Sequence, residues 1–261
     1  MDPDKTDASP PVPRPFLISF SGIDGAGKTT QIERLSSCLT QQGLRVLRLT
    51  FWDHVAVWSK ARARVGHRSM DSRVENLTAK SSFVPKNSKH VRKWYLTAVR
   101  SVLYLLDVAR LHRLLASQLI RNSDVVIFDR YIYDQIANIH SQSFASRTYS
   151  KILLRLTPAP GLAFILDALP VAAFARKPEY PLEFLHRNRQ TFLHLQELVP
   201  QLIIVSDAGA EEVSNEIHIH IGRSRLRERP SPEGKTEVTL ENAVVRLQTS
   251  CRVQNDPTAN I

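Results

Sequence analysis

The sequence contains little cysteine, with only Cys38 and Cys251 in 261 residues. Two cysteines argue against a disulfide-stabilised scaffold, and such scarcity is typical of a reducing compartment, so we expect a cytoplasmic protein. Long apolar runs are also missing: no stretch approaches the roughly 18 residues that a membrane-spanning helix needs. The first 15 residues hold five prolines and no apolar core, which does not resemble a secretory signal.

Two further absences narrow the class of protein. The guanine-reading motif N-K-x-D of GTPase switches does not occur, and the nine histidines show no metal-ligand spacing. His218 and His220 lie two residues apart in a predicted helix, hence on different faces, and we expect both at the surface. The sequence therefore gives no support for a GTPase switch or a histidine metal centre.

Acidic residues are scarce relative to basic ones, which gives a net charge of +10 and a pI near 9.9. Most of the excess lies in residues 54–100, where eleven lysines and arginines are opposed only by Asp71 and Glu75. A charge of this sign favours anionic partners such as nucleotides or nucleic acid. The segment is either a binding surface for an anionic acceptor or a solvated loop, and nucleic-acid binding is the less favoured alternative.

What the sequence does contain is an alternation of apolar strands and helical patterns. Strands are expected at 16–21, 44–51, 124–129, 162–167 and 201–206. Helical patterns occupy 28–43, a patch within 55–65, 89–121, 131–139, 146–156, 170–176 and 181–198, and a last one starts near Asp207 and fades by Arg223. This alternation predicts an α/β layered fold with a parallel sheet. We expect one domain over 16–222, a disordered lead at 1–15 and a charged, disordered tail at 223–261.

The loop after the first strand carries the most specific motif. Residues 22–29 fit G-x-x-x-x-G-K-[ST] between a predicted strand and a predicted helix, as a phosphate-binding P-loop requires; the alternative is a chance glycine turn. The backbone N–H groups of such a loop point at an anion, and the helix N-terminus adds partial positive charge. The lysine reaches the β- and γ-phosphates, and the threonine hydroxyl ligates Mg²⁺. We therefore predict that ATP with Mg²⁺ is bound by Gly22, Asp24, Gly25, Ala26, Gly27, Lys28, Thr29 and Thr30.

A pair of charged residues follows the third predicted strand. Asp129 and Arg130 stand at the end of 125-VVIFDR-130, at the sheet edge where open α/β folds bind ligands. We expect the carboxylate of Asp129 to join Thr29 as a Mg²⁺ ligand, and Arg130 to face a transferred or accepting phosphate. The alternative is that Asp129 caps the next helix and pairs with Arg130 at the surface.

These stretches resemble the thymidylate kinase family, within the P-loop nucleoside monophosphate kinases. The matching stretches are 21-SGIDGAGKTTQ-31, the triplet 129-DRY-131, 104-YLLDVAR-110, and 164-FILDALP-170 followed by 176-RKPEYPLEFLHRNRQTF-192. The resemblance implies a three-layer P-loop NTPase fold with a five-stranded parallel sheet flanked by helices, and a lid at about 176–190. It also implies transfer of the γ-phosphoryl group of ATP to a nucleoside monophosphate, as in nucleotide biosynthesis, and a homodimer formed through helices.

The resemblance further implies roles for individual residues. The catalytic residues would be Lys28, Asp129, Arg130 and Arg176, the last as a lid arginine that neutralises charge in the transition state. The substrate-binding residues would be Asp53, Arg110, Arg130 and Tyr131. Asp53, just after the second strand, would orient an acceptor hydroxyl or simply cap the following helix.

The acceptor half of the sequence departs from this family. Residues 49-LTFWDHV-55 stand where the family has an Arg-Glu-Pro triplet, Leu106 stands where an aromatic side chain stacks on thymine, and Asp134 stands where a serine follows the Asp-Arg-Tyr triplet. The acceptor is therefore predicted only as a small, dTMP-like nucleoside monophosphate. Two alternatives stay open: a P-loop kinase of another small phosphorylated acceptor, and a non-catalytic protein that binds a nucleotide or nucleic acid.

Overall fold

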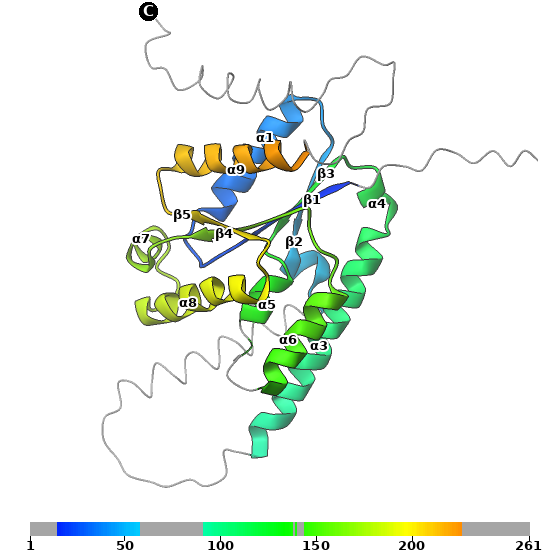
Figure 1. Ribbon diagram of the computed structural model, residues 1–261, viewed down its shortest axis with the longest axis vertical. Helices are drawn as coiled ribbons and strands as arrows, with labels where there is room; N and C mark the ends of the chain where they lie inside the picture. Colours follow the sequence, from blue (N-terminus) through cyan, green and yellow to red (C-terminus); the bar gives the residue numbers. More distant parts are fainter. Residues whose placement is uncertain (1–14, 58–90, 138, 140–143, 226–261) are drawn as a thin grey trace, which may run out of the picture.

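The computed structural model describes residues 15–57, 91–137, 139 and 144–225 (Figure 1). In this part of the chain five strands form one sheet in the order β2-β3-β1-β4-β5, and every neighbouring pair is parallel. The strands are β1 (Phe16–Ser21), β2 (Val46–Thr50), β3 (Val125–Asp129), β4 (Leu162–Asp167) and β5 (Leu202–Ser206). The predicted α/β fold with a five-stranded parallel sheet is confirmed.

The register of the strands brings their carboxyl ends together. Phe20 of β1 and Thr50 of β2 both pair with Asp129, so these three strands finish side by side. A parallel sheet of this kind is buried on both faces, which explains why the strands are nearly continuous apolar runs. The residues that follow the strand ends therefore meet at one edge of the sheet.

Helices cover both faces of the sheet (Figure 1). On one face α1 (Lys28–Gln41) and α9 (Ala210–Arg225) lie over an apolar cluster that includes Ile18, Phe20 and Ile32. The rings of Phe20 and Phe164 stack there at 5.3 Å between centroids. The opposite face carries α3 (Val91–Leu115), α5 (Ile132–Ala137), α6 (Phe144–Leu156) and α8 (Leu182–Leu198), and α7 (Pro170–Arg176) packs on α8 near the end of β4. The helix–sheet–helix layering matches the three-layer arrangement expected.

Most predicted elements agree with the structure to within a few residues, and two differ. The helix expected at 89–121 is interrupted: α3 ends at Leu115 and a short α4 (Gln118–Arg121) follows a turn in which Ser117 N–H donates to Leu114 O at 3.0 Å. After β2 the chain forms a single π-helical turn, η1 (Phe51–Val55), closed by Ala56 N–H donating to Phe51 O at 2.9 Å. Residues 58–65 of the predicted patch, most of the basic segment, residues 1–14 of the lead and residues 226–261 of the tail lie outside the described residues, whereas 223–225 of the predicted tail are the last residues of α9. The predicted domain limits stay a prediction.

One histidine differs from expectation. His218 is only 6% exposed, because α9 turns it towards the interior together with Ile217 and Ile221. Burial lowers the pKa of His218, against a smaller opposite effect of its hydrogen bond to the backbone of Ser214. The expectation that His218 lies at the surface is therefore wrong, because two residues i and i+2 can both touch a broad helix–sheet interface.

Among the described helices, none is long and apolar enough to cross a bilayer.

Candidate phosphate-binding site

The loop between β1 and α1 adopts a backbone that only glycine accepts at key positions. Gly22, Gly25 and Gly27 have φ values of 138°, 83° and 83°, in the left-handed region where other residues are strained. A Cβ atom on Gly22 would lie 2.5 Å from the carbonyl oxygen of Leu166, and one on Gly25 would collide with the carbonyl of Ala173. The loop thus wraps closely against the end of β4 and the middle of α7.

Lys28 lies in the first turn of α1 and folds back over the loop. Its side chain is 7% exposed, and Nζ donates to the carbonyls of Gly22 at 3.0 Å and Ile23 at 2.8 Å. Burial, and then the nearby charge of Arg130, lower its pKa to about 8, against the opposite effect of neighbouring carboxylates. The ammonium group is thus held at the loop, where an anionic phosphate would replace its carbonyl partners.

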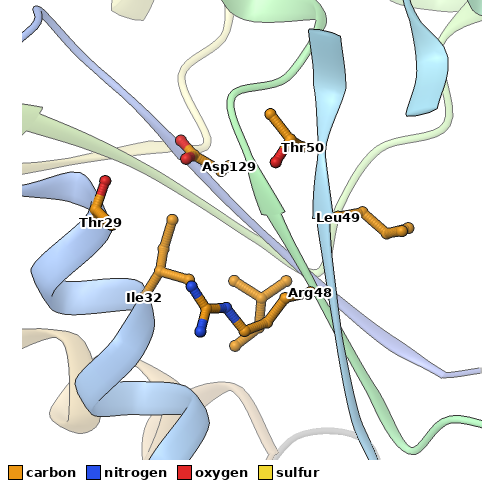
Figure 2. Close-up of a pocket in the computed structure, with 7 residues that line it drawn as sticks. Thr29, Ile32, Arg48, Leu49, Thr50 and Asp129 are labelled. Carbon is orange, nitrogen blue, oxygen red and sulfur yellow. The ribbon is translucent and has the colours of Figure 1, made fainter. Parts of the chain in front are cut away.

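Thr29 and Asp129 line one cavity of about 400 Å³ at the carboxyl end of the sheet (Figure 2). Thr50 adds a second hydroxyl at this end, and the remaining lining comes from Ile32, Arg48, Leu49 and Ile127. One carboxylate and two hydroxyls are hard oxygen ligands of the kind that Mg²⁺ accepts beside waters and substrate phosphates. No cluster of three His, Cys, Asp or Glu side chains occurs in the described ranges, so a metal here would need phosphate oxygens to complete its shell. The residues fit a Mg²⁺ ion that arrives with a nucleotide.

Arg130 stands directly after β3 in a strained backbone conformation. Its φ of 66° makes it the single non-glycine residue with positive φ in the described part of the chain, and its N–H donates to Phe20 O at 2.8 Å. The guanidinium contacts two carboxylates: Nη1 donates to Asp134 Oδ1 at 2.7 Å, and Nη2 forms an ion pair with Asp24 of the loop. Burial alone would lower the pKa of Arg130, but the charges of Asp134 and Asp24 outweigh it and raise the pKa.

Asp134 is a buried member of this group that sequence reasoning did not assign to the site. Its side chain is 3% exposed and its Oδ2 also accepts from Ser21 Oγ at 2.6 Å. The available signal was a carboxylate in the first turn of a short helix after Arg130, a position from which it reaches back to the helix start. The contact with Ser21 spans 113 residues, which no local pattern reveals.

The structure places Tyr131, which was predicted to bind substrate, in the core below the site, and its substrate-binding role stays a prediction. Its side chain is fully buried, and its hydroxyl donates to Pro158 O at 2.6 Å. The ring packs edge-on against Phe128 and Phe51, with centroids 5.3 and 6.3 Å away. Burial raises the pKa of the Tyr131 hydroxyl, followed by a smaller effect of Tyr133. Tyr131 is thus part of the core under the site, because the reversal of the chain at Arg130 turns the next side chain inwards.

Two arginines of the proposed lid, Arg176 and Arg189, form ion pairs near the ends of β5 and β4. Arg176 at the end of α7 contacts both carboxylate oxygens of Asp207 at 3.0 and 3.1 Å. Its Nη1 lies 3.8 Å from where a Cβ of Gly27 would be, so the guanidinium is beside the phosphate loop. Arg189 of α8 forms a bidentate pair with Asp167 at 2.5 and 2.7 Å. The structure thus brings the predicted Arg176 next to the loop; its catalytic role stays a prediction.

The predicted acceptor residues are less enclosed. Asp53 in η1 and Arg110 on α3 are both exposed, and neither has an ion-pair partner within the described ranges. The buried face of α3 instead presents Asp107, which is fully buried and was not predicted as a site residue. Asp107 accepts from Val57 N at 2.6 Å and from Gln135 Nε2 at 2.7 Å, so it ties α3 to α5 and to the chain two residues after η1.

A parallel sheet with this glycine-rich loop between β1 and α1 defines a P-loop NTPase type of α/β fold. No protein-family model matches the chain. It is 27% identical over 216 residues to a probable thymidylate kinase of Pyrococcus abyssi, covering 78% of this chain and 94% of that protein. It is 25% identical over 211 residues to a probable thymidylate kinase of Archaeoglobus fulgidus, covering 77% and 92%. The chain is 29% identical over 248 residues to the thymidylate kinase of Xanthomonas oryzae pv. oryzae, covering 90% and 95%.

Among solved structures, a thymidylate kinase from Ehrlichia chaffeensis matches 80% of this chain and all of that chain with a TM-score of 0.49 and 19% identity. The sequence similarity extends over most of both partners in each pair, and the same kind of protein recurs in two archaea and a bacterium. The chain is therefore thymidylate kinase-like, and the resemblance read from its motifs is confirmed.

Proposed function

We propose that the protein transfers the γ-phosphoryl group of ATP to a small nucleoside monophosphate that resembles dTMP. The observation that carries the proposal is the convergence of Lys28, Thr29 and Asp129 at the carboxyl end of the sheet, beside a loop that only glycines can form. The thymidylate kinases to which the chain is similar support a nucleoside monophosphate as acceptor. Phosphoryl transfer needs positioning and charge neutralisation rather than a covalent nucleophile, and the residue types found here supply both.

Each residue has a defined part in this proposal. The backbone N–H groups around Gly25 and Gly27 bind the donor's β-phosphate, and Lys28 contacts the β- and γ-phosphates. Thr29 and Asp129 would hold Mg²⁺, which neutralises charge on the phosphate oxygens when bound. Arg130 and Arg110 would contact the acceptor phosphate. Arg176, which lies beside Gly27, would stabilise the charge that develops during transfer.

The test is an ADP-release assay with purified protein, ATP and Mg²⁺ against dTMP, dUMP, the other nucleoside monophosphates and phosphorylated sugars. We expect dTMP or a close analogue to stimulate ADP release most strongly. Stimulation by a phosphorylated sugar alone would replace the acceptor class. If no compound stimulates ADP release although ATP still binds, the proposed activity is contradicted and a non-catalytic nucleotide-binding protein is favoured.

We also propose that two copies of the chain associate through α3. The support is a row of exposed apolar side chains at helical spacing, namely Val99, Val102, Leu105 and Leu106, which are 38–56% exposed. Light scattering after size exclusion should give twice the chain mass, and Val102→Asp should return a monomer. Val171→Asp, on the exposed side of α7, is the control that should leave the mass unchanged. A monomeric wild type would contradict this.

A cytoplasmic location is proposed on the low cysteine content alone.

A further inference from the structure

Four side chains around Arg130 form a connected group that we call the Arg130 clamp: Ser21, Asp24, Arg130 and Asp134. Asp24 lies in the phosphate loop, Ser21 ends β1, Arg130 follows β3, and Asp134 lies in the first turn of α5. The clamp therefore joins the loop that would hold the donor to the strand end that would meet the acceptor. Its side chains are all at most 22% exposed, so solvent screens their charges only weakly.

The backbone of Arg130 requires support from its surroundings. A left-handed φ of 66° costs energy for any residue with a side chain, and such conformations persist where neighbouring interactions hold them. The hydrogen bond from Arg130 N to Phe20 O fixes the backbone, and the two carboxylates fix the guanidinium. Arg130 is thus held at both ends of its side chain.

Asp134 holds more of this arrangement than any other clamp residue. Its Oδ1 accepts from Arg130, and its Oδ2 accepts from Ser21 Oγ at 2.6 Å and from Tyr131 N at 3.3 Å. Three donors on two oxygens need a carboxylate, which offers about four lone-pair sites. A serine hydroxyl, with a single oxygen, could not accept all three. Asp134 can therefore accept all three hydrogen bonds of this clamp, which a serine at the same position could not.

We propose that Asp134 is a positioning residue for phosphoryl transfer: it fixes the guanidinium of Arg130 between the phosphate loop and α5. This inference rests on the proposed function. Arg130 has five N–H donors, and the bonds to Asp134 and Asp24 use one on each Nη, so three remain for a phosphate. The two carboxylates also compensate the charge of Arg130. Asp134 therefore controls the orientation of the Arg130 guanidinium and not its charge alone.

The kinetic test uses Asp134→Asn. The amide keeps the size of the side chain but loses its charge, and its NH₂ group would face the donors of Ser21 and Tyr131. We expect kcat per nucleotide-binding site to fall at least tenfold and the acceptor KM to rise, because Arg130 contacts the acceptor phosphate, with the KM for ATP within twofold of wild type. A kcat within twofold of wild type, or an ATP KM that changes as much as kcat, would overturn the proposal.

The matched control is Asp124→Asn. Asp124 stands just before β3, at the opposite end of the strand, and its carboxylate also pairs with an arginine, Arg45, at 3.0 Å. Because this pair is exposed and far from the loop, the control should leave kcat unchanged. Should Asp134→Asn not fold, Ser21→Ala serves instead, since it removes one donor to Asp134 and should lower kcat about threefold with the fold intact. An unchanged kcat in Ser21→Ala would then overturn the proposal.

A second measurement does not depend on activity. In wild type, both Nη groups of Arg130 are held by carboxylates, so rotation about Cζ–Nε should be slow and give separate Nη signals in ¹⁵N NMR. Arg130→Lys assigns these signals by their loss. In Asp134→Asn they should merge; separate signals that persist unchanged, or a single averaged signal in wild type, would contradict the positioning role. If wild type transfers phosphate to no acceptor, the proposed function fails, while the NMR result still decides whether Asp134 positions Arg130.

Discussion

The phosphate-loop half of the site and its acceptor half differ in how many partners their charged side chains have. In the phosphate-loop half, Lys28 donates to two carbonyls and Arg176 lies in a two-oxygen pair with Asp207. Arg130, which joins the two halves, contacts two carboxylates. Arg110 and Asp53 are exposed and have no ion pair among the described residues. One half is thus organised before any ligand arrives, whereas the other presents charges that a ligand would have to engage. We infer that the fold fixes the donor and leaves the acceptor to complete its own site.

The largest effect is expected at Lys28. Replacement of Lys28 by Ala removes the buried ammonium group of the organised half, and kcat/KM should fall at least about a hundredfold. Steady-state ADP release measures this, with circular dichroism to verify the fold. Lys151→Ala, on the exposed side of α6, is the matched control and should retain wild-type activity. More than a tenth of wild-type activity in Lys28→Ala would mean that the organised half is not the donor site.

The second prediction concerns the buried carboxylate of Asp107, which accepts two hydrogen bonds within the acceptor half. Asp107→Ala leaves the buried donor of Gln135 and the partly buried donor of Val57 without this acceptor, so the free energy of unfolding should fall by about 2–4 kcal/mol. Urea denaturation gives the value. Asp53→Ala, an exposed carboxylate of the same half, should change it by less than about 0.5 kcal/mol. Equal losses of stability in Asp107→Ala and Asp53→Ala would mean that the hydrogen bonds of Asp107 do not stabilise the acceptor half.

A smaller effect is expected at Arg110. Since this guanidinium has no ion-pair partner in the described part of the chain, Arg110→Ala should raise the acceptor KM about tenfold, which corresponds to about 1.4 kcal/mol. The KM for ATP should not change. Arg113→Ala, one turn further along the exposed side of α3, is the control. An equal rise in both KM values would place Arg110 outside the acceptor site.

The smallest effect is a pH dependence of nucleotide binding. The pKa of Lys28 is about 8, so most of the free protein carries the ammonium at pH 7 and loses it as the pH rises through 8. ATP binds the charged form and must then take up a proton, so its affinity should fall about fourfold between pH 7 and pH 8.5. Titration with a non-hydrolysable ATP analogue measures this. Lys28→Arg, which keeps its charge throughout, should show no such change; a flat profile in wild type would refute the assignment.

The difference between the two halves also explains what could be predicted from the sequence. The phosphate loop, the strand before it and Asp129 follow from short motifs and apolar runs, because their geometry is set by neighbours along the chain. The contacts of Asp134 with Ser21 and of Asp107 with Gln135 join residues 113 and 28 positions apart. Such pairs depend on how layers pack. The inward turn of Tyr131 could not be predicted either, because it depends on the left-handed backbone at Arg130.

The close approach of Gly25 to α7 has a mechanical consequence. The backbone of the phosphate loop rests against the carbonyl of Ala173, without a side chain between them to yield. At the other end of the proposed lid, the bidentate pair of Arg189 with Asp167 fastens α8 to the end of β4. A lid that closes while both attachments hold has its two hinges inside these points, between Ala173 and Arg189. The turn at 177–181, which carries Pro178 and Pro181, is then the part that moves. The distance it can move is limited by the short span between the two fixed attachments.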